Sequence, residues 1–289
     1  MEEVSGIRAG LGEGPVWSAE EGVVYWIDIP GKALHRTDPT TRVTESWPMP
    51  SHPGNVSLRK TGGLVVALED GLYSFDRSSE SLSHLVAIED EIADNRPNDG
   101  KCDALGRLWF GTMNKVDGTR PTGRFYRVDT DLTVTEIADG IEIPNGLAWS
   151  PDDRVMYHTD THSNMVSAYT FDAVRGERSA RRDFFPFDRQ KIGGVDGAAV
   201  DVEGGYWTVL FRGAKLIRVL PDGRVDREVA LPVSQPTMPA FGGVDLKTLF
   251  ITSATEGLDG PARHTQAFAG GLLAVPVDVA GCPVHAFGG

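Results

Sequence analysis

The chain has 289 residues, of which 40% are hydrophobic and 8% aromatic, enough to build an apolar core. Its 34 glycines and 18 prolines imply many turns between short elements. The formal net charge of −13 argues against nucleic acid or an anionic membrane surface as a partner, because both favour a concentrated basic face. The composition therefore predicts a turn-rich β protein, with residues 1–289 in one domain, whose ligand is neutral or cationic.

Cysteine usage and the N-terminal residues bear on the compartment. Cys102 and Cys282 form no CxxC motif, so we expect two free thiols in a reducing compartment rather than a disulfide framework. Residues 1–6 lack the basic and then apolar pattern of a signal peptide, and no apolar run approaches ~18 residues. The sequence predicts a cytoplasmic location and leaves the oligomeric state open.

One pattern recurs along the whole chain: a polar turn, usually with Gly or Asp, precedes a short apolar and aromatic run. The runs start roughly 40 to 50 residues apart, which is the period of a propeller blade. Their first residues are Val23, Leu64, Leu108, Val155, Tyr206 and Leu249. An ordinary β-sandwich would not require six units in phase, so the repeat predicts an all-β, six-bladed β-propeller.

Further short runs flank most of these starts and predict four antiparallel strands per blade. Runs ahead of the starts, such as 15–17, 146–149 and 197–200, are interpreted as inner strands, and runs beyond them, such as 72–76 and 216–219, as third strands. Few residues follow the sixth start. We therefore expect Val4–Ala9 to supply or complete a strand of the last blade and close the ring between the two termini.

The repeat also predicts a site. At one shared offset before the six starts stand Glu13, Gly54, Asn98, Asn145, Asp196 and Pro239. Because inner strands surround the axis of a propeller, equal offsets place these positions at similar depth around one channel. Asn145 alone would be explained as a turn residue, but the shared offset favours a site.

Two of these positions, Glu13 and Asp196, carry carboxylates, which repel each other in a narrow channel. A divalent cation would relieve that repulsion. Oxygen ligands without Cys or His suit Ca²⁺, Mg²⁺ or Mn²⁺, and Zn²⁺ and Fe²⁺ also accept them, so the identity of the one ion stays open.

Other residues carry weaker signals. Arg96, in the loop that also holds Asn98, has a guanidinium suited to hydroxyl or carbonyl groups of a ligand, with a solvated loop arginine as the alternative. His158, Asp160 and His162 are too far apart on a strand for one zinc ion, so packing and turn hydrogen bonds are the preferred interpretation. Signature motifs of serine hydrolases, zincins, P-loops and dinucleotide sites are absent from the sequence.

Five stretches together resemble the regucalcin (senescence marker protein) family, which includes bacterial gluconolactonases and xylonolactonases. They are residues 11–17, 95–101, 111–113, 144–147 and 195–197. The resemblance covers nearly the whole chain and implies a six-bladed propeller, metal ligands at Glu13, Asn145 and Asp196, and substrate contacts at Arg96 and Asn98. One departure is that Asn114-Lys115-Val116 stands where some members place an acidic residue that meets substrate hydroxyls.

The resulting hypothesis is metal-dependent hydrolysis of small sugar lactones to aldonic acids. The metal would polarise the lactone carbonyl, and Asp196 would hold or deprotonate the attacking water. Two alternatives use the same scaffold: a non-catalytic calcium-binding regulator, and a broader arylesterase or organophosphate hydrolase. The preferred lactone, the metal and the role of Asp196 as base or only as ligand are not determined by the sequence.

Overall fold

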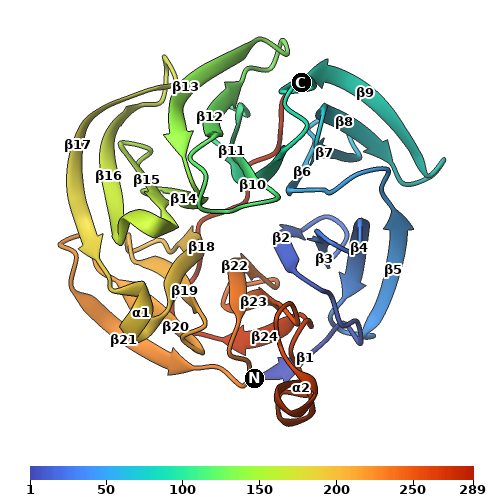
Figure 1. Ribbon diagram of the computed structural model, residues 1–289, viewed down its shortest axis with the longest axis vertical. Helices are drawn as coiled ribbons and strands as arrows, with labels where there is room; N and C mark the ends of the chain where they lie inside the picture. Colours follow the sequence, from blue (N-terminus) through green and yellow to red (C-terminus); the bar gives the residue numbers. More distant parts are fainter.

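The computed structural model describes residues 1–289 and contains six four-stranded antiparallel sheets arranged in a ring, as predicted (Figure 1). Blade 1 consists of β2 (Gly12–Ser18), β3 (Val23–Asp28), β4 (Ala33–Asp38) and β5 (Val43–Pro48). Blade 2 consists of β6 (Asn55–Leu58), β7 (Leu64–Leu68), β8 (Gly71–Asp76) and β9 (Ser81–Ala87). Blade 3 consists of β10 (Asn95–Cys102), β11 (Leu108–Asn114), β12 (Gly123–Val128) and β13 (Val134–Ile141).

The second half of the ring has the same plan. Blade 4 consists of β14 (Pro144–Trp149), β15 (Val155–Asp160), β16 (Met165–Asp172) and β17 (Glu177–Pro186). Blade 5 consists of β18 (Gly194–Val200), β19 (Tyr206–Phe211), β20 (Lys215–Val219) and β21 (Val225–Ala230). Blade 6 consists of β22 (Pro236–Gly242), β23 (Thr248–Ser253), β24 (Leu273–Pro276) and β1 (Glu2–Glu3).

The predicted N-terminal strand lies at a different place in the chain. We expected it within Val4–Ala9, but β1 is Glu2–Glu3, which pairs with β24 at the edge of blade 6. The carboxylate of Glu3 accepts hydrogen bonds from the amides of Ser5 (2.8 Å) and Gly6 (2.9 Å), and this local turn ends the strand. Val4 and Ala9 keep single backbone bonds to Leu272 and Gly270.

Helical structure is minor: α1 (Arg189–Ile192), α2 (Gly260–Thr265) and the 3₁₀ turn η1 (Thr161–Ser163). None of these helices has the length and apolar composition needed to cross a membrane.

The position of a strand in its blade explains its burial. All six residues of β14 and all seven of β22 are buried, because inner strands pack against neighbouring blades and against each other. The outer strand β21 alternates between half-buried and exposed residues, as expected for a strand with one face in water. Six apolar clusters fill the six junctions between neighbouring blades, so the core is a ring rather than a single centre.

We call the side on which the inner strands begin the mouth face, and the side on which they end the far face. The C-terminal segment 281–289 crosses the far face. Its backbone bonds reach the ends of three blades: Cys282 N donates to Val200 O (3.0 Å), Phe287 N to Leu58 O (2.7 Å) and Gly288 N to Gly106 O (2.9 Å). Phe287 is completely buried, so this segment is part of the packed structure.

Candidate active site at the mouth of the channel

A register break at one level of the ring positions the candidate residues. Five of the six inner strands depart from regular pairing with their neighbours at this level. A bulge bends the strand and interrupts the regular alternation of side chains between the two faces of the sheet. The breaks lie between Glu13 and Val16, Pro97 and Gly100, Asn145 and Ala148, Val195 and Ala198, and Pro236 and Pro239.

Glu13 and Asp196 form the acidic centre of this level. Burial and the charge of Asp99 raise the pKa of Glu13 to about 8. Burial, followed by the charges of Glu13 and Asp99, raises the pKa of Asp196 well above its ordinary value. The nearby guanidinium of Arg96 lowers both pKa values but does not cancel these effects. The two predicted carboxylates are therefore close enough to destabilise each other's charge.

A chain of hydrogen bonds joins the other predicted residues. Arg96 Nη1 donates to Asn98 Oδ1 (2.8 Å), and Asn98 Nδ2 donates to Asn145 Oδ1 (3.0 Å). Asn145 Nδ2 donates to Thr161 Oγ1 (2.8 Å), whose hydroxyl donates to the carbonyl of Val195 (2.8 Å). Because Val195 precedes Asp196, this chain connects blades 3, 4 and 5 and links Asn145 to the backbone next to Asp196.

Asp99 belongs to the same site, although the offset pattern did not select it. It is 9% exposed, and burial raises the pKa of its carboxyl group. Its Oδ2 accepts a hydrogen bond from Leu147 N (2.9 Å), whereas its buried Oδ1 has no partner in the protein. The shared offset selected Asn98 and not the adjacent Asp99. Regular pairing would send these two side chains to opposite faces of the strand, and the register break between Pro97 and Gly100 removes that restriction.

The two remaining offset positions supply no polar side chain. A Cβ atom on Gly54 would lie only 2.1 Å from the carbonyl oxygen of Pro97, so the backbone of blade 3 occupies the space that a side chain would need. Pro239 lines the channel further in. The histidines have the packing and hydrogen-bonding roles that were the preferred interpretation: His158 is buried against the ring of Phe125 at 4.5 Å, while His162 pairs with Glu142 at the mouth.

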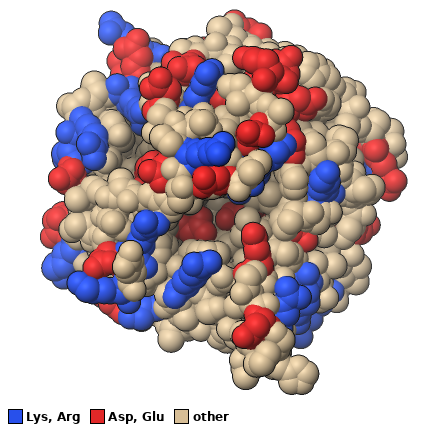
Figure 2. Space-filling model, in the orientation of Figure 1, with Lys and Arg blue, Asp and Glu red and all other residues tan.

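The mouth face is hollowed near its centre (Figure 2). Acidic atoms lie deep in this hollow, and Lys and Arg side chains surround it. The arrangement gives a ligand a recessed acidic floor within a rim that carries charges of both signs.

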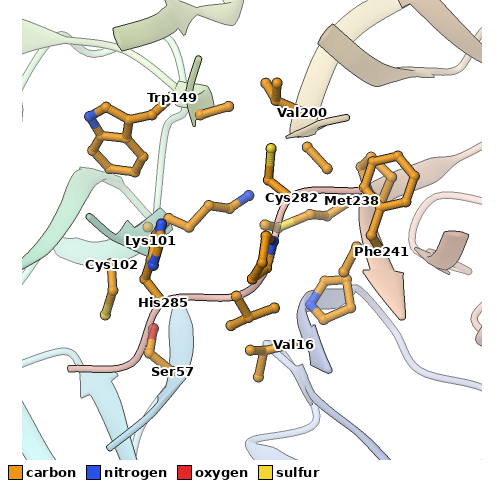
Figure 3. Close-up of a pocket in the computed structure, with 18 of the residues that line it drawn as sticks. Val16, Ser57, Lys101, Cys102, Trp149, Val200, Met238, Phe241, Cys282 and His285 are labelled. Carbon is orange, nitrogen blue, oxygen red and sulfur yellow. The ribbon is translucent and has the colours of Figure 1, made fainter. Parts of the chain in front are cut away.

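Inside the channel, on the far side of this level, lies a chamber of about 200 Å³ (Figure 3). Its wall is largely apolar and includes Val16, Met238 and Phe241, while residues 282–285 of the C-terminal segment also line it. Lys101 extends into the chamber, and its ammonium donates a hydrogen bond to the carbonyl of Ala198. Both Cys102 and Cys282 are free thiols that line the chamber, and burial raises their pKa values to about 12 and 11.

The donor set at the mouth fits a hard divalent cation. No group of three or more His, Cys, Asp or Glu side chains is arranged to hold a metal ion. The oxygen donors at this level are the carboxylates of Glu13 and Asp196 and the amide oxygen of Asn145. Two observations favour a cation there: the two carboxylates repel each other, and the buried Oδ1 of Asp99 next to them has no partner. Oxygen-only donors of this kind suit Ca²⁺, Mg²⁺ or Mn²⁺.

A family model described as the SMP-30/Gluconolactonase/LRE-like region matches residues 11–255. The chain belongs to this family. The resemblance inferred from the five short stretches is thereby confirmed, and the matched region contains every predicted site residue from Glu13 to Asp196.

Individual members of the SMP-30/gluconolactonase family match over almost the full chain. A 6-deoxy-6-sulfogluconolactonase of Pseudomonas putida is 38% identical over 279 residues, which cover 96% of this chain and 95% of the relative. Regucalcin of Xenopus laevis is 33% identical over 285 residues, with coverages of 96% and 95%. The crystal structure of a calcium-binding regucalcin from Agrobacterium tumefaciens aligns with a TM-score of 0.94 at 28% identity, covering 99% of this chain and 96% of that one.

Proposed function

We propose that this protein hydrolyses sugar lactones to aldonic acids at the mouth of its channel. The observation that carries the proposal is the pair of carboxylates Glu13 and Asp196: burial raises the pKa values of both, and the charge of Glu13 raises that of Asp196 further. A chain of hydrogen bonds leads from Arg96 through Asn98, Asn145 and Thr161 to the carbonyl of Val195, next to Asp196. The sulfogluconolactonase of P. putida, which is similar along almost its whole length, supports a sugar lactone as the substrate class.

Glu13, Asn145 and Asp196 would hold one divalent ion. When bound, the ion supplies a positive charge that polarises the lactone carbonyl and stabilises negative charge on its oxygen. Hydrogen bonds hold the Asn145 amide in one orientation, since its oxygen accepts from Asn98 and its nitrogen donates to Thr161. One lone pair of its Oδ1 is used by Asn98, which leaves the other for a ligand.

Asp196 would act on the attacking water. Its carboxylate can accept a hydrogen bond from that water and take its proton. The water oxygen adds to the carbonyl carbon while Asp196 takes its proton. The bond from that carbon to the ring oxygen then breaks, and Asp196 returns the proton to the ring oxygen. The product is the open-chain aldonic acid, whose carboxyl group ionises and releases the proton that the assay measures.

Arg96 and Asn98 would orient the sugar. Nη1 of the guanidinium donates hydrogen bonds to Asn98 Oδ1 and to the carbonyl of Pro97 (2.8 Å each). Its other nitrogens have no hydrogen-bond partner in the protein. Those N–H groups are available to the hydroxyls of a bound lactone.

A calcium-binding protein without catalytic activity is the second candidate, because the relatives named regucalcin include one described as calcium-binding. Both functions need the ion, but only an enzyme needs Asp196 for turnover. A broader esterase is distinguished from a sugar lactonase by its activity on aryl esters that carry no sugar hydroxyls.

The test measures proton release from freshly prepared lactones by metal-stripped protein and by protein reloaded with Ca²⁺, Mn²⁺, Mg²⁺, Zn²⁺ or Fe²⁺, each against a buffer-plus-metal blank. We expect metal-dependent acceleration that Asp196→Asn abolishes and Asp188→Asn retains. Asp188 is an exposed carboxylate that caps α1, and asparagine preserves a cap. Metal binding without acceleration would favour the calcium-binding candidate instead.

A further inference from the structure

The chamber inside the channel is a second cavity, separate from the candidate active site. None of the predicted site residues, from Glu13 to Asp196, lines its wall. Its volume is about 200 Å³. A dry apolar cavity of roughly 150 Å³ is large enough to hold one benzene molecule. The chamber therefore has room for a small organic molecule in addition to a substrate at the mouth.

Lys101 gives this largely apolar wall an unpaired positive charge. It is the only lysine or arginine that lines the chamber, and its side chain extends into the space (Figure 3). The ammonium has three donors, of which one is used by the carbonyl of Ala198, and it forms no salt bridge. Burial lowers the pKa of Lys101, and the charges of Asp99 and Glu13 oppose this effect, but neither carboxylate is hydrogen-bonded to the ammonium. Two donors therefore remain for a ligand.

The one carboxylate in the wall does not compete for these donors. Asp153 lies at the far-face end of the chamber, in the turn between β14 and β15. Burial raises the pKa of Asp153, and the charge of His285 in the C-terminal segment opposes this effect. Asp153 is not among the charges that act on Lys101. The ammonium thus faces the chamber without an ionic partner from its wall.

We propose that the chamber is a binding site for a small apolar monocarboxylate of about the size of benzoate. The carboxylate accepts hydrogen bonds from the two free donors of Lys101 and supplies the negative charge that this buried ammonium otherwise lacks. The apolar part of the ligand lies against Trp149, Met238 and Phe241, which line the wall. A hydrophilic acid such as gluconate satisfies the ammonium but not this wall, and an uncharged aromatic molecule satisfies the wall but not the ammonium.

Calorimetric titration of the metal-stripped protein with benzoate and with benzamide tests this site. Benzamide has nearly the same shape as benzoate but no charge, and removing the metal excludes binding of the carboxylate to an ion at the mouth. We expect one benzoate per chain, bound roughly 10- to 150-fold more tightly than benzamide, which is the contribution of a hydrogen bond to a charged group. Lys101→Met keeps the unbranched stem but removes the ammonium, so it should reduce the affinity for benzoate to that for benzamide.

Two further variants locate the site. Cys282 lines the chamber, so Cys282→Leu should reduce the free volume and weaken the binding of both ligands. Lys247→Met replaces an exposed lysine in the turn between β22 and β23 on the far face and should change neither affinity.

Three results would overturn the proposal. Absence of benzoate binding at millimolar concentrations would show that the chamber holds only water. Equal affinities for benzoate and benzamide in the wild type would show that Lys101 does not recognise the charge. Unchanged benzoate binding in Lys101→Met and Cys282→Leu proteins that melt as the wild type does would place the ligand elsewhere. If Lys101→Met does not fold, the wild-type comparison and Cys282→Leu decide the question.

Discussion

Replacing Arg96 by methionine tests how the mouth positions its substrate. Methionine keeps an unbranched apolar stem but removes every guanidinium donor. In the wild type, Arg96 Nη1 holds Asn98 Oδ1 at 2.8 Å, and Asn98 in turn holds Asn145. A hydrogen bond that involves a charged group contributes about 1.5–3 kcal/mol, which corresponds to a roughly 10- to 150-fold change in an equilibrium or rate constant.

We therefore expect Arg96→Met to raise KM for gluconolactone by roughly 10- to 150-fold if one such bond to the sugar is lost. The value of kcat should change less, because Glu13, Asn145 and Asp196 remain. Arg96→Lys should give an intermediate KM, since lysine keeps the charge but not the planar arrangement of donors. Initial rates of proton release at saturating metal, corrected for spontaneous hydrolysis, provide both constants.

Arg189→Met serves as the control, because Arg189 is an exposed arginine on α1 at the same face. It should leave KM unchanged. An unaltered KM in a folded Arg96→Met protein would refute the assignment of Arg96 to substrate orientation. A loss of kcat with no change in KM would instead place Arg96 in the stabilisation of the transition state.

Two further predictions concern stability. Burial lowers the pKa of His158 to about 3, whereas an unfolded histidine titrates near 6.5, so the unfolded chain takes up the proton first and stability should fall as pH drops from about 6.5 toward 3. His158→Phe places a ring without a titratable group against Phe125 and should reduce the fall in melting temperature over this pH range. An unchanged dependence of melting temperature on pH would contradict the assignment of this fall to His158. Phe287→Ala should lower the free energy of unfolding by about 3–5 kcal/mol, because Phe287 is completely buried, whereas Val284→Ala, at a side chain that is 38% exposed, should change it little. Equal effects in urea titrations would show that the C-terminal segment does not pack on the far face as described.

The repeat made the ring predictable from the sequence. Turn residues and apolar runs are local signals that can be found in the sequence. Glu13, Asn98, Asn145 and Asp196 stand at one constant offset before these runs, which predicts that they lie at one level of the channel. The pattern worked because equivalent strands in a propeller are related by rotation about the axis.

Features that depend on a strand bulge, on contacts between blades or on a local turn were not predictable in this way. Asp99 was missed because its orientation depends on the break between Pro97 and Gly100, and a bulge is a property of the paired backbone. The contact between Lys115 and Glu69 joins loops of two blades, and no periodicity relates these two residues. The N-terminal strand was misplaced because the turn around Glu3 outweighed the apolar pattern that begins at Val4.

The account depends on one ion held by Glu13, Asn145 and Asp196 being required for turnover. The most direct measurement titrates metal into stripped wild-type, Glu13→Gln and Asp196→Asn proteins and records bound metal and lactone hydrolysis on the same samples. We expect wild-type activity to rise with the first bound equivalent and then level off, and both variants to lose metal affinity and activity together. Full activity in stripped protein, or tight metal binding that both variants retain, would contradict the account.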